Sequence, residues 1–364
     1  MVKVQRVRLP ESQKISWLVL GDDFLPIRPI QEFLTYLENI ERSPNTIRSY
    51  AHHLRLYWQY LQEKHLDWTT VGLSEFAEFV HWLRQPEAAI VSVQPQEARR
   101  SEATINVILT AVCTFCDDQE RLEKYLGNSL YREQVQPHRK YKSFLHHINK
   151  GKPVRTRLIK LKVPKRLPQT LTADQVAQLL SACHRLRDKF LISLMYESGL
   201  RIGQALGLRH EDIHSWDNTI YVIPRNDNPN GARAKTRESY SIPVSPALMR
   251  LYTDYLVHEF DEIESDFVFV NLWDGVIGTP MKYGAVIELF RRISKASGIL
   301  AHPHLLRHTH ATDLLRSGMG AAYVQKRIGH ASIQTTLDTY THLTDDDLKQ
   351  AYHTFKQTTK GESV

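Results

Sequence analysis

The sequence is poor in the features that mark exported or membrane proteins. Its 364 residues include 3 cysteines, and so few cysteines in so long a chain cannot build a disulfide framework. No apolar run approaches the roughly 18 residues of a membrane span. Near the N-terminus the apolar stretch Trp17–Leu20 is shorter than the roughly 7 to 15 residues of a signal-peptide core. We therefore expect a cytoplasmic protein without membrane association.

The composition excludes disorder and fibrous repeats. Hydrophobic residues make up 42% of the chain and charged residues 24%, with 16 glycines and 16 prolines, which is ordinary for a globular protein. At roughly 150 residues per domain, the length predicts about two domains, each able to form a hydrophobic core.

Positive charge is concentrated in one stretch. The net charge is +7, but residues 139–166 hold eleven basic and no acidic residues, so the rest carries 36 basic against 40 acidic residues. The eleven are Arg139, Lys140, Lys142, Lys150, Lys152, Arg155, Arg157, Lys160, Lys162, Lys165 and Arg166. Such a stretch favours a nucleic-acid partner, because each neutralised phosphate releases counterions. The alternative is a solvated charge run that binds any acidic surface.

Hydrophobic periodicity predicts a mostly α-helical protein with a small β-sheet. The expected organisation is an N-terminal β-like arm at 1–26, a helical domain at 27–136, an extended basic linker at 137–168 and a mixed α/β domain at 169–364. Expected helices lie at 30–40, 44–63, 73–84, 101–118, 172–183, 187–198, 246–260, 281–297, 304–317, 321–328 and 344–357. Expected strands of the second half lie at 219–223, 238–244 and 267–272.

One face of the helix expected at 44–63 is basic. Arg48, His52 and Arg55 recur at steps of four and three, so they share a side of the helix. Two interpretations stay open, a solvated face or a face that contacts DNA phosphates.

Two groups of residues could in principle bind a metal, but their surroundings in the sequence argue against it. Cys113 and Cys116 form a C-x-x-C pair, but zinc needs two more ligands and a redox motif needs a preceding strand. We expect buried core cysteines. Four crowded histidines, His302, His304, His308 and His310, include an i, i+4 pair, yet Leu305 stands where a metalloprotease helix has glutamate and Arg307 would oppose a cation. We expect no metal and no other cofactor.

Four local patterns in the second half carry reactive polar residues. They are Gly199-Leu200-Arg201 with Leu206, the hairpin lysine Lys235 before Ile242-Pro243-Val244, the run His304-Leu305-Leu306-Arg307-His308-Thr309, and Ile328-Gly329-His330 followed by Tyr340. Each is weak alone. In this order they resemble the tyrosine recombinase (integrase) family of site-specific DNA recombinases, over residues 172–345. Ser43-Pro44-Asn45-Thr46-Ile47-Arg48-Ser49-Tyr50 resembles the start of that family's helical core-binding domain, and transposon-encoded members, including transposase A proteins, are the nearest resemblance.

The resemblance implies a catalytic set in this chain: Arg201, Lys235, His304, Arg307, His330 and the nucleophile Tyr340. The distribution of positive charge predicts DNA contacts from Arg48, His52, Arg55 and the basic linker, including Arg139, Lys140, Lys142, Lys160, Lys162, Lys165 and Arg166. Gln204 replaces a glutamate found in many relatives. His330 and Tyr340 lie ten positions apart rather than nine, and Arg233 and Arg237 flank Lys235.

The residue types fit transfer of a phosphodiester to a phenol. Tyr340, with an ordinary pKa near 10, needs a base or cations to attack. Guanidinium forks of Arg201 and Arg307 suit the charge that develops on non-bridging oxygens. Lys235 suits protonation of the leaving 5′ oxygen. The scheme uses neither metal nor ATP.

The resemblance also implies an assembly. Four protomers would act on two DNA duplexes and exchange strands in two steps through a Holliday junction, bound to the nucleoid and with accessory proteins of a mobile element. A helix at 344–357 would dock on a neighbouring protomer, or pack within its own chain. Two other functions stay open: a type IB topoisomerase, and a DNA-binding regulator without activity.

Overall fold

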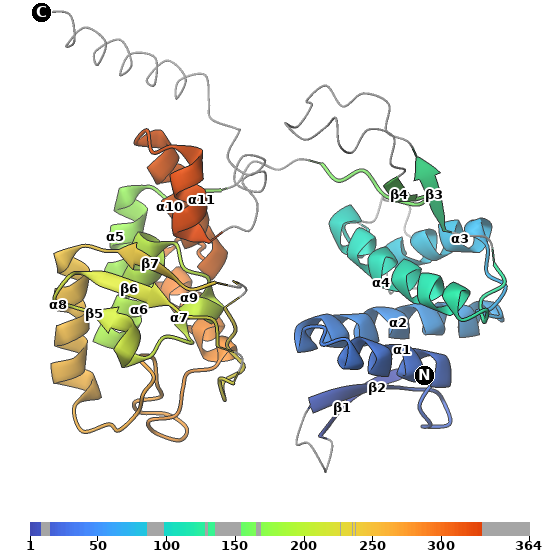
Figure 1. Ribbon diagram of the computed structural model, residues 1–364, viewed down its shortest axis with the longest axis horizontal. Coiled ribbons are helices and arrows are strands. Elements are labelled where there is room, and N and C mark those ends of the chain that lie inside the picture. Colours follow the sequence, from blue (N-terminus) through green and yellow to red (C-terminus); the bar gives the residue numbers. More distant parts are fainter. Residues whose placement is uncertain are drawn as a thin grey trace, which may run out of the picture. The chain divides into compact units, whose positions relative to one another are not determined.

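The computed structural model describes residues 1–8, 15–85, 98–127, 130–134, 154–164, 169–225, 227–234, 236 and 238–329. The chain forms two compact units, Met1–Lys165 and Arg166–Val364, drawn in Figure 1. The boundary falls inside the stretch predicted as a linker. No helix among the described residues is long and apolar enough to cross a membrane.

Unit 1 begins with a β-hairpin and continues with four helices. Strands β1 (Lys3–Arg8) and β2 (Ile15–Leu20) pair antiparallel. Helices α1 (Arg28–Asn39), α2 (Pro44–Lys64), α3 (Leu73–Arg84) and α4 (Glu102–Arg121) follow, each within a few residues of its predicted bounds. Capping explains one of these starts, because the Ser101 hydroxyl accepts a hydrogen bond from the Thr104 N–H at 3.4 Å.

Aromatic rings and the two cysteines fill the core of unit 1. The Tyr57 ring lies 5.6 Å from that of Phe76 and 5.4 Å from that of Phe79. Cys113 and Cys116 are buried, as predicted, and burial raises the pKa of Cys113 to about 11. These thiols are therefore protonated and inert at neutral pH.

The hairpin shares this core with the helices. Val2 and Val19 are fully buried within the same cluster as α1 and α2, and Val19 pairs with Val4 across the hairpin. The described part of residues 1–26 is therefore packed onto the helices rather than extended away from them.

Part of the basic stretch is also held on unit 1. Strand β3 (Tyr131–Gln134) pairs with β4 (Val154–Arg157). Beyond it, the Asn106 side chain accepts a hydrogen bond from the Leu161 N–H at 2.9 Å and donates to the Leu161 carbonyl at 2.8 Å. Val154–Arg157 is thus held by β3, and α4 fixes the backbone of Leu161.

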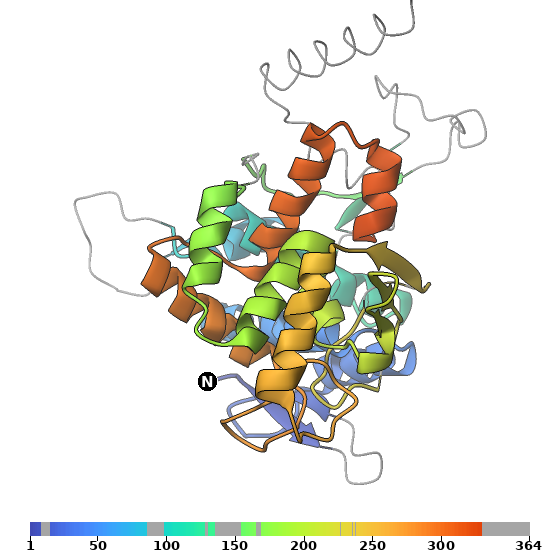
Figure 2. The same ribbon diagram turned by 90° about the vertical axis from the view of Figure 1, so that its left-hand side faces the viewer.

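Unit 2 surrounds a central helix with other helices and a small sheet. Its described elements are α5 (Ala173–Ser181), α6 (Leu186–Ser198), α7 (Ile202–Ala205), the 3₁₀ turn η1 (His210–Asp212), the antiparallel strands β5 (Ile213–His214), β6 (Thr219–Val222) and β7 (Tyr240–Pro243), α8 (Pro246–Tyr255), the π turn η2 (Leu256–Phe260), α9 (Tyr283–Ser297), α10 (Pro303–Arg316) and α11 (Ala321–Ile328). Helix α6 packs against α8 and α10 (Figure 2). The mostly helical class with small sheets is the predicted one.

One predicted strand is wrong. Residues 267–272 form only isolated bridges, Arg209 with Phe267 and Val270 with Pro280. Val268, Phe269 and Val270 are nonetheless fully buried, because a short apolar run signals burial without specifying a strand. The predicted helix at 246–260 is α8 ending in the π turn η2. The helix expected at 344–357 lies outside the described residues.

Candidate active site

The glycine that ends α6, Gly199, packs closely against α10. Gly199 ends α6 in the left-handed region at φ 66°, which favours glycine. A Cβ there would lie 2.7 Å from Cδ2 of His310, so a larger residue would push the two helices apart. The Gly199 carbonyl accepts a hydrogen bond from Nη1 of Arg307 at 2.7 Å.

Helix α10 carries two of the predicted site residues. Arg307 is buried, with 4% of its surface exposed, whereas His304 is exposed one turn earlier. The helix begins after His302, whose Nδ1 accepts from the Leu305 N–H at 3.2 Å. Since His304 and Arg307 are three residues apart on one helix, they lie on the same side of α10.

Arg201 connects α7 to the end of α11. Its Nη1 donates to the Gly329 carbonyl at 3.2 Å, and its backbone N–H donates to Oε1 of Gln204 at 2.9 Å. Burial lowers the pKa of Arg201 below its usual value. The Arg201 side chain is therefore held by the residue that precedes His330 in the sequence.

The hairpin after β6 approaches the same place. A Cβ on Gly203 would lie 2.6 Å from the Arg233 carbonyl oxygen, so the hairpin backbone lies directly on α7. A Cβ on Gly329 would lie 3.3 Å from Cγ2 of Thr236. Lys235, His330 and Tyr340 lie outside the described residues. Thr236 follows Lys235 and Gly329 precedes His330, and these two described residues meet beside Arg201.

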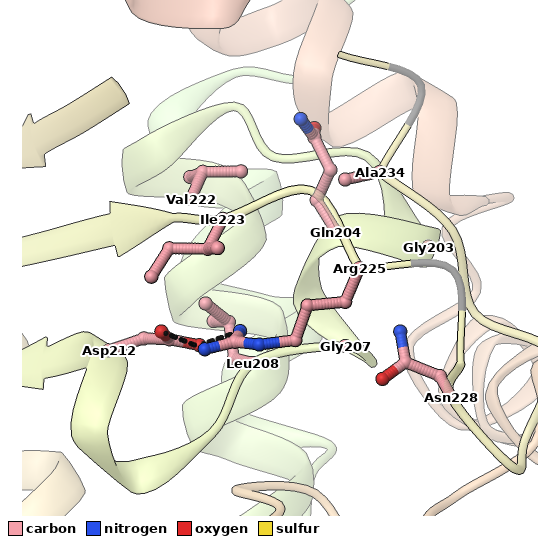
Figure 3. Close-up of a pocket in the computed structure, with 10 residues that line it drawn as sticks. All are labelled: Gly203, Gln204, Gly207, Leu208, Asp212, Val222, Ile223, Arg225, Asn228 and Ala234. Carbon is pink, nitrogen blue, oxygen red and sulfur yellow. Dashed lines mark hydrogen bonds and ion pairs between the residues drawn. The ribbon is translucent and has the colours of Figure 1, made fainter. Parts of the chain in front are cut away.

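A small cavity lies under this hairpin, lined by Gly203, Gln204, Gly207, Leu208, Asp212, Val222, Ile223, Arg225, Asn228 and Ala234 (Figure 3). Its volume of ≈ 10 Å³ holds about one water molecule. On one wall Arg225 makes a bidentate ion pair with buried Asp212, at 2.7 and 2.8 Å. The cavity is too small for a substrate, and the ion pair braces the base of the hairpin.

Helix α11 is attached by a pair that the sequence did not reveal. Arg327 donates from Nε to Nε2 of His310 at 3.1 Å and from Nη2 to the Glu197 carbonyl at 3.1 Å. Burial, together with the charges of Arg327 and Arg307, lowers the pKa of His310 to about 3. His310 is therefore a neutral acceptor. No group of three metal-type ligands exists among the described residues, and spacing alone gave no sign of this arginine–histidine contact.

The predicted DNA-contacting residues differ in exposure, and the structure describes only some of them. Arg48 and His52 are exposed and Arg55 is half-buried. The Trp17 ring of β2 lies 5.3 Å from the Arg48 guanidinium and 5.8 Å from the His52 ring. Burial, followed by the charges of Arg48 and Arg55, lowers the pKa of His52, so His52 is neutral at pH 7. Lys160 and Lys162 are exposed, while Arg139, Lys140, Lys142, Lys165 and Arg166 lie outside the described residues.

The mostly helical fold and the two arginines held close together fit an enzyme that acts on DNA phosphates. Comparison with known proteins gives its family. Residues 169–347 match the phage integrase family, and residues 30–117 match the phage integrase N-terminal SAM-like domain. The chain belongs to the phage integrase family. It is a tyrosine recombinase of the transposon type, an enzyme that recombines DNA at specific sites, as the sequence motifs predicted.

The individual relatives match most of the chain. Transposase A from transposon Tn554 of Staphylococcus aureus is 43% identical over 97% of this chain and 98% of the transposase. Tyrosine recombinase XerD of Listeria monocytogenes is 29% identical over 90% of this chain and 97% of its own. A solved structure of the Tn1549 transposon integrase with transposon right end DNA shares the fold, with a TM-score of 0.61 and 18% identity over 90% of this chain and 99% of that one.

Proposed function

We propose that this chain cleaves and rejoins DNA through a covalent 3′-phosphotyrosine bond on Tyr340, in the integration or transposition of a mobile element. The observation that carries the proposal is the convergence of Arg201 and Arg307. One is fixed by the Gly329 carbonyl and the other by the Gly199 carbonyl, two residues before Arg201. Two permanent positive charges are thereby brought to one location that the flanks of Lys235 and His330 also reach.

Charge on the scissile phosphate explains the two arginines. When the phenolic oxygen of Tyr340 attacks phosphorus, negative charge grows on the non-bridging oxygens, and guanidinium groups already in place stabilise it without reorganisation. His304 lies on the same side of α10 as Arg307, where it can accept the phenol proton. His330 would supply a further hydrogen bond.

Proton transfer completes the cycle without an energy source. The bond from phosphorus to the 5′ oxygen breaks as Lys235 gives that oxygen a proton. The new phosphotyrosine ester then replaces the phosphodiester that was broken. A 5′ hydroxyl from another strand attacks this ester and returns its proton to Lys235, while His304 gives its proton back to the departing oxygen and so restores the Tyr340 phenol.

Double-stranded DNA is the partner that the charges support. Lys160 and Lys162 are exposed on either side of Leu161, whose backbone is bonded to Asn106 of α4, and Arg48 is exposed on α2. Each can neutralise a phosphate regardless of sequence. Action as a homo-tetramer on two recombination sites, with accessory proteins of the element and on nucleoid DNA of the cytoplasm, follows from the family resemblance.

A nicked suicide DNA substrate tests the proposal. A nick near the cleavage position lets the short fragment with the new 5′ hydroxyl diffuse away, so that it cannot religate. The wild-type protein should therefore accumulate as a covalent 3′ adduct, and Tyr340→Phe should form none. An adduct formed by Tyr340→Phe would show that the nucleophile is another residue. Relaxation of supercoils without exchange between two sites would favour a topoisomerase, and loss of cleavage on adding a chelator would indicate a metal.

A further inference from the structure

Tyr240 is a phenol that the proposed catalytic set does not include. It begins β7 and is half-buried. Its hydroxyl accepts a hydrogen bond from Nε2 of Gln204 at 3.0 Å, while Oε1 of Gln204 accepts the Arg201 backbone N–H at 2.9 Å. A backbone N–H can only donate, so the amide oxygen must face Arg201 and the amide nitrogen must face Tyr240. The direction of both hydrogen bonds is therefore fixed by chemistry.

This direction leaves the Tyr240 proton for another acceptor. Within the described part of unit 2, the Tyr240 hydroxyl makes no second hydrogen bond. It lies against Gly329, where a Cβ would be 2.8 Å from the phenolic oxygen, and Nη1 of Arg201 binds the carbonyl of that same glycine. A guanidinium has donors and no acceptor. An anion bound by the arginines would supply the acceptor that the hydroxyl lacks.

We propose that the Tyr240 hydroxyl donates a hydrogen bond to a non-bridging oxygen of the scissile phosphate, beside Arg201 and Arg307, and that Gln204 sets its direction. The inference rests on the proposed function. Tyr240 acts as a donor and not as a second nucleophile, because burial raises the pKa of its phenol despite the opposing effects of Gln204, Arg307 and Arg201. The phenol therefore keeps its proton at neutral pH.

The same geometry explains glutamine at position 204. A glutamate there would accept from both the Arg201 N–H and the Tyr240 O–H, because a carboxylate has no proton to donate. The hydroxyl would then turn toward residue 204 and away from the phosphate. Gln204 and Tyr240 therefore form a functional pair. The amide donates to the phenolic oxygen, so the phenol O–H bond points toward the substrate.

The test measures adduct formation on the nicked substrate, with two versions of the scissile phosphate. On the ordinary phosphate, Tyr240→Phe should form adduct about 10- to 100-fold more slowly than wild type, at or below the smallest loss expected for one oxyanion donor. On a methylphosphonate, a methyl group replaces one non-bridging oxygen. With one of the two stereoisomers, the wild-type and Tyr240→Phe rates should agree within about twofold, because the acceptor of that hydrogen bond is gone.

Two results would overturn the inference. Equal rates of the two proteins on the ordinary phosphate would show that the hydroxyl has no role. An equal loss on the phosphate and on both methylphosphonates would show that Tyr240 only braces the fold. Failure of wild type itself to form any adduct would instead contradict the proposed function, so the two failures are distinct.

Two further variants sharpen the test. Gln204→Glu should slow adduct formation, and adding Tyr240→Phe to it should slow the reaction no further, since the hydroxyl is already turned away. An additional loss in the double variant would contradict the pairing. Tyr221→Phe removes a hydroxyl from the neighbouring strand β6 and should leave the rate unchanged. Each variant's melting temperature and DNA affinity, kept near wild type, show that it has folded.

Discussion

The two cationic surfaces of this recombinase are built in opposite ways. In unit 2, Arg201 and Arg307 are each held by a backbone carbonyl from a segment distant in sequence. In unit 1, Arg48 is exposed and its guanidinium lies over the Trp17 ring. A ring face restrains the position of a guanidinium less than a hydrogen bond does. The difference fits the roles that we propose for the two sets of residues. Stabilising a transition state requires charges at defined positions, whereas holding a phosphate backbone requires only charge.

The largest expected effect comes from changing the fork of Arg307 without changing its charge. Arg307→Lys keeps the positive charge but cannot hold the Gly199 carbonyl and a phosphate oxygen in one plane. We expect adduct formation to fall by about 10²- to 10³-fold, with DNA affinity within about twofold in a mobility-shift titration. The control is Arg291→Lys, at an exposed arginine paired with Glu288, which should leave both unchanged. Near-normal cleavage by Arg307→Lys would mean that charge alone suffices at this position.

Next in size is the effect of Gly199→Ala on stability. The substitution adds a Cβ at φ 66° and at 2.7 Å from His310, so we expect the free energy of unfolding to fall by more than about 2 kcal/mol. Gly318→Ala is the matched control, since Gly318 has φ 88° but nothing within 4 Å of the new Cβ. It should cost about 1 kcal/mol. Urea titration measures both, and equal losses would show that the contact between α6 and α10 is not tight.

A smaller effect concerns the dependence of stability on pH. His310 has a folded pKa of about 3 against an ordinary value of 6.5, so the unfolded chain takes up the proton first as pH falls. Its contribution is fully present above pH 6.5 and is lost as the pH drops toward 3. At pH 5 the loss is about 2 kcal/mol. His310→Gln should therefore lose about 2 kcal/mol less than wild type between pH 7.5 and pH 5 in urea titrations. Parallel curves for the two proteins would mean that His310 is not held neutral.

The smallest effect belongs to the loosely held surface. Arg48→Ala should weaken DNA binding only a few-fold and reduce the slope of log K against log salt by about 1, as expected for the loss of one phosphate contact. Adduct formation at saturating protein should stay the same. Arg28→Ala, at an exposed arginine paired with Glu32, is the control and should leave the slope unchanged. A large loss of cleavage in Arg48→Ala would remove the distinction between the two surfaces.

Sequence reasoning succeeded where local patterns carry the information. The four helices of unit 1 and the burial of Cys113 and Cys116 were predicted because each depends on residues close together in the sequence. The motif around Arg201 and Arg307 identified the family for the same reason.

It failed where contacts depend on three-dimensional packing. The pairing of Arg327 with His310 joins two helices, and the bond from Gln204 to Tyr240 joins α7 to β7. Nothing in residue spacing indicates either contact. The buried run at 267–272 was mistaken for a strand because burial and strand pairing produce the same apolar pattern.

The central claim is that Tyr340 is the attacking group of a site assembled around Arg201 and Arg307. Mass spectrometry of the trapped, nuclease-treated adduct tests it most directly, because trypsin cleavage after Arg327 and Lys349 yields a peptide whose single tyrosine is Tyr340. We expect a nucleotide linked to that peptide. A nucleotide found on the peptide that carries Tyr323 or Tyr240, or on any other, would contradict it.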